Sequence, residues 1–174
     1  DLRRSRGLGD VYKRQARYMY RLISSHATLF TEMIASQAIY RGDYEKFLKK
    51  DIIEHPVILQ VGGSDPELLK FSTRLANKFH YQGINLNVGC PSKKVSQGRM
   101  GACLMKEAEV VKKCVEEMIK ESSIDVSVKC RIGVDEFESY DFFKNFILTV
   151  ANGGCDTFFI HARNCLLYTS PSPR

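Results

Sequence analysis

Five short apolar runs in this sequence each end in one polar side chain. An apolar strand such as 57–59 or 158–160 gains nothing by finishing on a group that must be desolvated, unless several strand ends meet at a ligand. The carboxyl ends of the strands do meet in parallel α/β barrels. The pattern therefore predicts a polar site at one edge of a parallel sheet. The five residues are Glu32, Gln60, Asn87, Lys129 and His161.

The third of these runs is followed by a thiol. Apolar and amide side chains alternate over residues 84–88, which is the period of a strand. Gly89 predicts a sharp turn and Pro91 a stiff exit, so Cys90 is expected at the mouth of the strand. The polar, glycine-containing segment 92–102 is expected to be a loop, and such loops carry function more often than packing. Taken alone, a cysteine after a strand is more often structural than catalytic.

Helical patterns separate the strands. Residues 64–67 (Ser-Asp-Pro-Glu) predict a capping box with proline in the first turn, and amphipathic helices are expected over 110–119 and 140–150. This alternation predicts right-handed βαβ units and a parallel sheet. A doubly wound sheet also fits, but polar groups at every strand end favour a partial TIM (β/α)8 barrel with about five parallel strands, the second to the sixth. The strands are expected to begin near Thr28, Pro56, Ile84, Asp125 and Thr157.

Composition sets broad limits. The 174 residues are 44% hydrophobic and 26% charged, which is typical of a globular protein with one substantial core. No apolar stretch approaches the roughly 20 residues of a membrane span, and no secretory signal is recognisable, so a cytoplasmic location is the default expectation.

The two ends of the chain resemble translated adaptor sequence. We expect residues 1–15 to be a non-native leader, 165–174 a non-native tail, and 16–164 a partial barrel domain. The ends carry +4 of the net charge of +6, so the basic balance is weak evidence for nucleic-acid binding. If the leader is native, a basic arm that contacts phosphates is the alternative.

The six cysteines include no C-x-x-C pair and show no ligand spacing with the histidines, so neither a metal site nor a redox pair is expected. Cys114, Cys130 and Cys155 are expected to be small buried hydrophobes. Cys103 stays open, because it lies in the loop region but precedes apolar residues.

Several segments together resemble one family. Residues 84–92 read Ile-Asn-Leu-Asn-Val-Gly-Cys-Pro-Ser and are followed by Gly98 and by Gly-Ala-Cys-Leu-Met at 101–105. This closely resembles the signature of the tRNA-dihydrouridine synthases, most of all the A subfamily. The resemblance continues in matching order over 16–164, which is more specific than one motif. The other matching segments are 31–33, 54–57, Gln60, 63–66, 128–133 and 160–163.

The resemblance implies an FMN-dependent barrel enzyme that uses NADPH to reduce the C5–C6 bond of particular tRNA uridines. Reduced flavin delivers hydride to C6, and Cys90 is the matching acid for C5. A thiol suits this step because its reference pKa of about 8.5 leaves it mostly protonated at neutral pH. The matching flavin-contacting positions are Gln60, Asn87, Lys129 and His161.

Each flavin assignment has a structural alternative. Gln60 could satisfy backbone groups, Lys129 could be a snorkelling surface lysine, and His161 could be an interior histidine. Their joint occurrence at equivalent strand positions favours the flavin interpretation. Glu32 is left open between the pocket and its surroundings.

Contacts with tRNA are expected at a basic rim, where a flipped uridine would enter. Solvated loop charges are the alternative for each residue. Asn87 could also pair with the uracil edge. The rim residues are Lys93, Lys94, Arg99, Arg131 and Arg163.

The family's first strand and its last two strands have no match here, nor does its carboxyl-terminal helical domain. We therefore expect a fragment that neither retains FMN nor turns over. Two other functions stay open: a dihydroorotate dehydrogenase-like flavin barrel that acts on a free pyrimidine, and a catalytically silent RNA-binding scaffold. Which uridines are modified, and the oligomeric state, cannot be read from the sequence.

Overall fold

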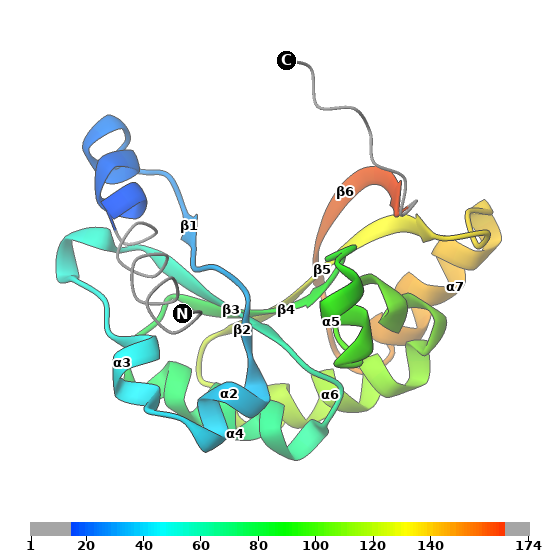
Figure 1. The fold of residues 1–174 in the computed structure, drawn as a ribbon, viewed down its shortest axis with the longest axis horizontal. Coiled ribbons are helices and arrows are strands. Elements are labelled where there is room, and N and C mark those ends of the chain that lie inside the picture. The colour runs from blue at the N-terminus through cyan, green and yellow to red at the C-terminus, as the bar shows by residue number, and fades with distance from the viewer. Residues whose placement is uncertain (1–14, 166–174) are drawn as a thin grey trace.

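A computed structural model describes residues 15–165, without the side chains of Lys93, Lys94 and Cys165. Its centre is a parallel sheet in the order β1-β3-β4-β5-β6, which curls into a half-barrel (Figure 1). The described sheet has 6 strands, because β1 and β2 both pair with β3. The α/β half-barrel predicted from the sequence is confirmed. The strands are β1 (Leu29–Phe30), β2 (Ile34–Ala35), β3 (Val57–Gly62), β4 (Gly83–Val88), β5 (Asp125–Val134) and β6 (Thr157–Cys165).

A contact between two aromatic rings shows how strongly the sheet is curled. β1 and β6 stand at opposite ends of the strand order, which in a flat sheet would separate them by about 19 Å. The rings of Phe30 and Phe159 nevertheless meet edge to face, with centroids 5.1 Å apart. The sheet is therefore strongly curled, and β1 and β6 approach each other across its concave face.

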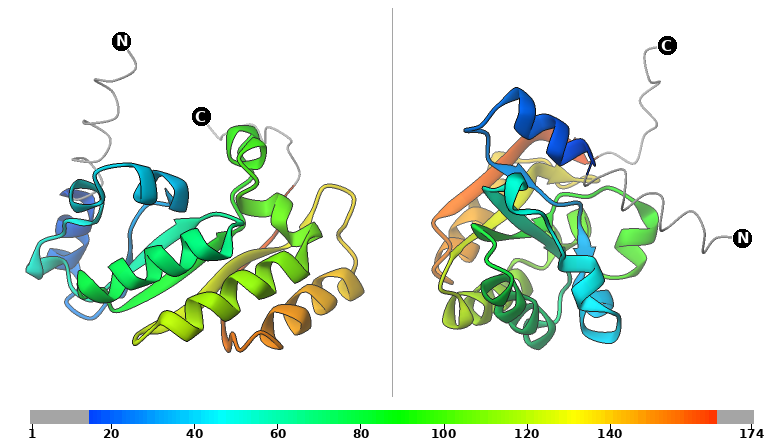
Figure 2. Two further views of the ribbon diagram at one scale, coloured as in Figure 1. Left: turned by 90° about the horizontal axis from the view of Figure 1, so that it is seen from below. Right: turned by 90° about the vertical axis from the view of Figure 1, so that its left-hand side faces the viewer.

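Helices cover the convex face of the sheet. α4, α6 and α7 lie side by side against it in Figure 2, as the right-handed βαβ connections require. Shorter helical segments fill the connections. Their bounds are α2 (Ser36–Arg41), α3 (Tyr44–Leu48), η1 (Ile52–Glu54), α4 (Pro66–Lys78), α5 (Lys93–Gln97), η2 (Gly101–Lys106), α6 (Ala108–Glu121) and α7 (Tyr140–Ala151), preceded by a helix over 15–23.

Two local expectations need correction. The N-cap of α4 is Asp65 rather than Ser64, because the Asp65 carboxylate accepts hydrogen bonds from the backbone N–H groups of Glu67 and Leu68. Segment 92–102 is not an open loop, since α5 and the start of η2 occupy much of it. A capping box does occur before η1, where Asp51 and Glu54 satisfy each other's backbone N–H groups.

The hydrophobic core lies between the sheet and its helices. Val57, Leu59 and Val61 are fully buried on the convex side of β3, while Gln60 alternates with them and points to the concave side. Every residue of β4 is buried, as expected for a central strand of a parallel sheet. Cys114, Cys130 and Cys155 also belong to this core, as predicted.

The helix over 15–23 is held by two buried arginines. The Arg17 guanidinium lies 2.6 Å from the Glu54 carboxylate and 3.2 Å from that of Glu32. Arg21 donates to the carbonyls of Glu54 and Pro56, just before β3. Glu32, which the sequence left open, thus forms an ion pair with Arg17.

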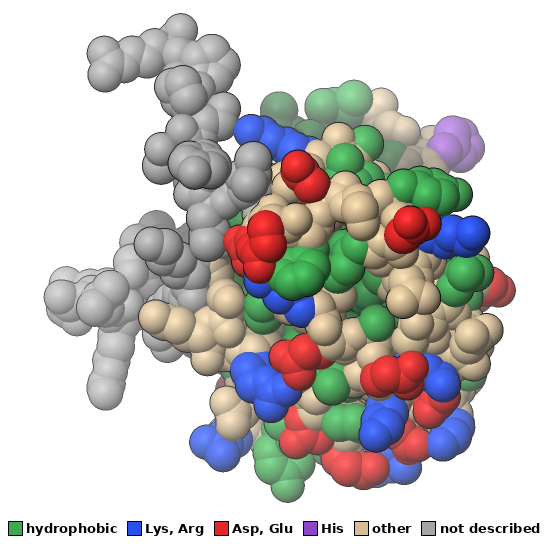
Figure 3. All heavy atoms as spheres, turned by 90° about the vertical axis from the view of Figure 1, so that its right-hand side faces the viewer, with side chains coloured by type: hydrophobic (Ala, Val, Ile, Leu, Met, Phe, Trp, Pro, Cys, Tyr) green, Lys and Arg blue, Asp and Glu red, His purple; other side chains and the backbone are tan. Residues whose placement is uncertain are grey.

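The outer surface is mixed in charge. On the face shown in Figure 3, acidic and basic side chains alternate and form no patch of one sign. Within the described residues, no helix has the length and apolar character needed to cross a membrane.

Candidate active site

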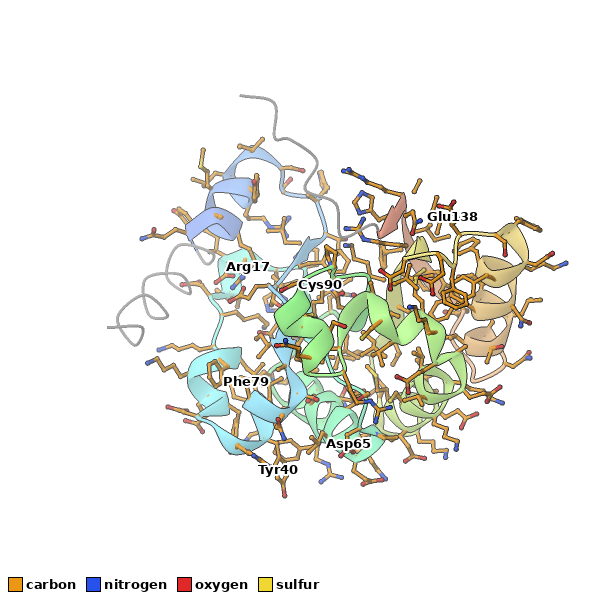
Figure 4. All side chains as sticks on the ribbon, turned by 45° about the vertical axis from the view of Figure 1, so that its right-hand side comes forward. Arg17, Tyr40, Asp65, Phe79, Cys90 and Glu138 are labelled. Carbon is orange, nitrogen blue, oxygen red and sulfur yellow. The ribbon has the colours of Figure 1, made fainter. Side chains whose placement is uncertain are left out.

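The turn that carries Cys90 is held by Asn87. The Asn87 side-chain oxygen accepts hydrogen bonds from the backbone N–H groups of Gly89 (3.0 Å) and Cys90 (2.9 Å). Asn87 is the next-to-last residue of β4, a central strand of the sheet. The turn is therefore attached to a rigid part of the structure. Cys90 itself is half-buried with a free thiol, and Figure 4 places it near the middle of the molecule beside α5.

A glycine further along the chain closes the turn from the other side. The Cys90 carbonyl accepts a hydrogen bond from the Ala102 N–H at 3.0 Å. Gly101 has a φ of +74°, and a Cβ there would lie 2.6 Å from the Cys90 carbonyl oxygen. Gly89, by contrast, is not among the described residues with positive φ, and a Cβ there would meet its nearest neighbour at 3.4 Å. The turn expected at Gly89 is present, but the left-handed backbone that closes it belongs to Gly101.

Gln60 lies on the concave face and is held by two amides. Its Nε2 donates to the Asn85 oxygen at 3.0 Å, and its Oε1 accepts from Asn87 Nδ2 at 2.8 Å. Its backbone N–H donates to the hydroxyl of Thr31. The structural alternative was that the Gln60 side chain satisfies backbone groups. Instead, both of its polar atoms bond to side-chain amides.

Lys129 and His161 reach the same face from β5 and β6. Lys129 is level with Asn87 in the β4–β5 register, and His161 is level with Arg131 in the β5–β6 register. Lys129 forms no hydrogen bond or ion pair within the part of the chain that the structure describes. The positive charge of Arg131 lowers the pKa of His161, with smaller effects of desolvation, Lys129 and Arg163. This edge is thus electropositive and favours an anionic ligand.

The predicted basic rim is brought together only in part. Arg131 Nε donates to the Gly89 carbonyl at 2.7 Å, so this side chain supports the thiol turn. Arg99 forms an ion pair with Glu107. Arg163 is exposed near the end of β6. The backbone of Lys93 and Lys94 begins α5, but their side chains lie outside the described part of the structure.

Sequence reasoning missed three residues of this site. Asn85 and Ser127 lie level with Gln60 on the two neighbouring strands, with Asn85 Nδ2 donating to Ser127 Oγ at 3.0 Å. The alternation of amides over 84–88 was a usable signal for Asn85. Ser127 and Gly101 gave none, because their roles depend on the register between strands and on the path of a connection.

Comparison with known proteins decides the family. A model described as dihydrouridine synthase matches residues 8–172. The chain belongs to the dihydrouridine synthase family. Curated relatives include tRNA-dihydrouridine(20/20a) synthases from Yersinia pestis (48% identical, 91% of this chain and 46% of the relative), Vibrio cholerae (49%, 91% and 48%) and Synechocystis sp. (46%, 91% and 47%).

The chain spans about half the length of the curated relatives it matches. In this dihydrouridine synthase family member, Lys129 lies level with Asn87, which holds the Cys90 turn, and His161 lies level with Arg131 on the neighbouring strand. Within the described residues, no three His, Cys, Asp or Glu side chains cluster as metal ligands would.

Proposed function

We propose that this chain carries the thiol-bearing, flavin-binding part of an enzyme that reduces uridines of tRNA to 5,6-dihydrouridine, with FMN as cofactor and NADPH as reductant. Given the names of its relatives, the D-arm uridines at positions 20 and 20a, which the A subfamily modifies, are the proposed targets. The observation that supports the proposal is the strand register, which puts the Cys90 turn, Lys129 and His161 at neighbouring positions on β4, β5 and β6.

The concave face suits a planar, anionic ring. Lys129 offers an ammonium group with no partner in the described residues. Each of these –NH2 groups, Gln60 Nε2 and Asn87 Nδ2, has two hydrogens and makes one hydrogen bond within the described residues, so one N–H of each is left for a ligand. These groups and His161 would hold the ring, and reduced FMN would supply the hydride for C6 of the uracil.

Cys90 would supply the proton for C5. Its backbone is fixed by hydrogen bonds to Asn87 and Ala102, and Arg131 holds the preceding Gly89 carbonyl, so the turn that carries the thiol is held in place relative to the concave face. A group held in place reacts with less loss of orientational freedom, which is the basis of efficient proton transfer in an enzyme site. Arg163, Arg99, Lys93 and Lys94 would contact tRNA phosphates around the entrance.

The test compares two half-exposed thiols in a polypeptide extended to the length of the relatives. Cys90→Ala should leave the reduction of bound flavin by NADPH intact and lower dihydrouridine formation by about 100-fold or more. Cys103→Ala is the matched control, because the Cys103 thiol makes weak hydrogen bonds to the backbone carbonyls of Met100 and Ser96. Product formation by Cys90→Ala at the control's rate would contradict the proposed acid.

The chain by itself covers about half of such a protein, so we expect it not to retain FMN. Absorbance of the purified chain at visible wavelengths checks this. A yellow preparation with one FMN per chain would show that expectation to be wrong.

A further inference from the structure

A continuous chain of side-chain hydrogen bonds crosses the concave face beneath the thiol turn. It runs from Ser127 on β5 to Asn85 on β4, then to Gln60 on β3, and back to Asn87 on β4. The successive distances are 3.0 Å, 3.0 Å and 2.8 Å. Its last member holds the backbone of Cys90 at 2.9 Å. The chain links the floor of the half-barrel to the proposed acid.

The direction of every bond in this chain is determined. Backbone N–H groups only donate, so the Asn87 oxygen must face Cys90 and the Asn87 nitrogen must face Gln60. Gln60 then receives that bond on its oxygen and donates with its nitrogen to Asn85. Asn85 in turn donates to the Ser127 hydroxyl, which lies 3.4 Å from the Ile84 carbonyl and donates to it. Each amide therefore has one allowed orientation.

Burial makes this orientation costly to lose. Asn85 is completely buried, and Ser127 and Asn87 are 3% and 6% exposed. An amide that loses its partner here finds no water to replace it. If the Ser127 hydroxyl is removed, the Asn85 nitrogen has no acceptor. If the Asn85 amide turned over, its –NH2 group would face the –NH2 group of Gln60, and two donors would meet. Gln60 could not turn to accept this bond, because its oxygen accepts from Asn87, whose amide is fixed by the backbone N–H groups of Gly89 and Cys90.

We propose that Ser127 and Asn85 are positioning residues, which stabilise the Gln60 amide in the one orientation that also fits Asn87, so that Gln60 presents an N–H group to the flavin ring. This inference rests on the proposed function, because FMN is the ring those groups would meet. Neither residue needs to touch the cofactor. Their effect is transmitted through the amide orientation.

The first test measures orientation directly in this chain, by hydrogen exchange of side-chain and backbone amides observed by NMR. Ser127→Ala should speed exchange of the Gln60 and Asn85 side-chain N–H groups about fivefold or more. Ser127→Thr keeps the hydroxyl and should restore slow exchange. Ser72→Ala is the matched control, because Ser72 is equally buried but donates only to the Leu68 carbonyl in α4.

The second test uses the polypeptide extended to the relatives' length. Ser127→Ala should weaken FMN binding about fivefold or more and shift the visible absorption band of the bound flavin, whereas Ser127→Thr and Ser72→Ala should not. Exchange rates in Ser127→Ala that match those of Ser72→Ala would overturn the positioning role. Faster exchange in Ser127→Ala, together with no FMN binding by the parent, would support the hydrogen-bond chain and overturn the proposed function.

Discussion

Replacing Gly101 with alanine tests how the thiol turn is built. Gly101 combines a left-handed backbone with close approach to the Cys90 carbonyl, and a Cβ would also lie 2.8 Å from a methyl group of Val95. A backbone atom cannot move aside as the end of a flexible side chain can. The substitution should therefore disturb the Cys90 turn and α5 together.

The expected loss can be worked from two contributions. A left-handed backbone costs alanine about 1–2 kcal/mol relative to the right-handed regions, a cost that glycine escapes. Forcing an extra methyl group into a packed site costs about 1–3 kcal/mol. Because one backbone shift can relieve part of both, we expect Gly101→Ala to lower the free energy of unfolding by about 2–4 kcal/mol.

Urea unfolding followed by circular dichroism measures this loss. With a slope of about 1–3 kcal/mol/M, the midpoint should fall by roughly 1–2 M. Gly89→Ala is the control, since a Cβ there would make ordinary contacts, and it should change stability by less than about 1 kcal/mol. Equal midpoints for the two variants would refute the assignment of the turn to Gly101.

Three further outcomes follow from the structure. At pH 8, alkylation followed by mass spectrometry should show that Cys90 is modified well before the buried thiols of the core. Burial raises the pKa values of those thiols, to about 12 for Cys114 and Cys130. Equal alkylation rates would contradict this burial. The protected thiols are Cys114, Cys130 and Cys155. Arg131→Gln should raise the pKa of His161 toward 6.5, so the imidazole stays protonated to higher pH in an NMR titration. An unchanged titration midpoint would argue against the proximity of the Arg131 and His161 side chains. Glu54→Ala should lower the free energy of unfolding in urea by about 3 kcal/mol, because it leaves the buried Arg17 with only the more exposed Glu32 carboxylate. A loss below about 1 kcal/mol would mean that the Arg17–Glu54 ion pair is dispensable.

Much of the site could be predicted because its residues sit on strands with a clear period. Alternation over 84–88 predicts which side chains of β4 face the convex helices and which face the concave side, and the structure confirms it. The same logic correctly brought Gln60, Lys129 and His161 to one face. The interpretation of Arg131 as a rim residue did not anticipate its bond to the Gly89 carbonyl, because that contact depends on how two strand ends align.

The amino-acid sequence by itself determined the alternation of strands and helices and the parallel half-barrel, because periodicity and burial act along the chain. The expected polar strand ends need correction, since β5 and β6 continue past Lys129 and His161, to Val134 and Cys165, and Glu32 lies between β1 and β2. Only the tertiary structure decided which glycine frees the Cys90 turn, that Ser127 and Asn85 orient Gln60, and that Arg131 supports the thiol. The role of the glycine depends on the path of a connection, and the side-chain contacts depend on the register between strands that are distant in sequence. A displacement of one residue along a strand would turn each of these side chains to the opposite face of the sheet.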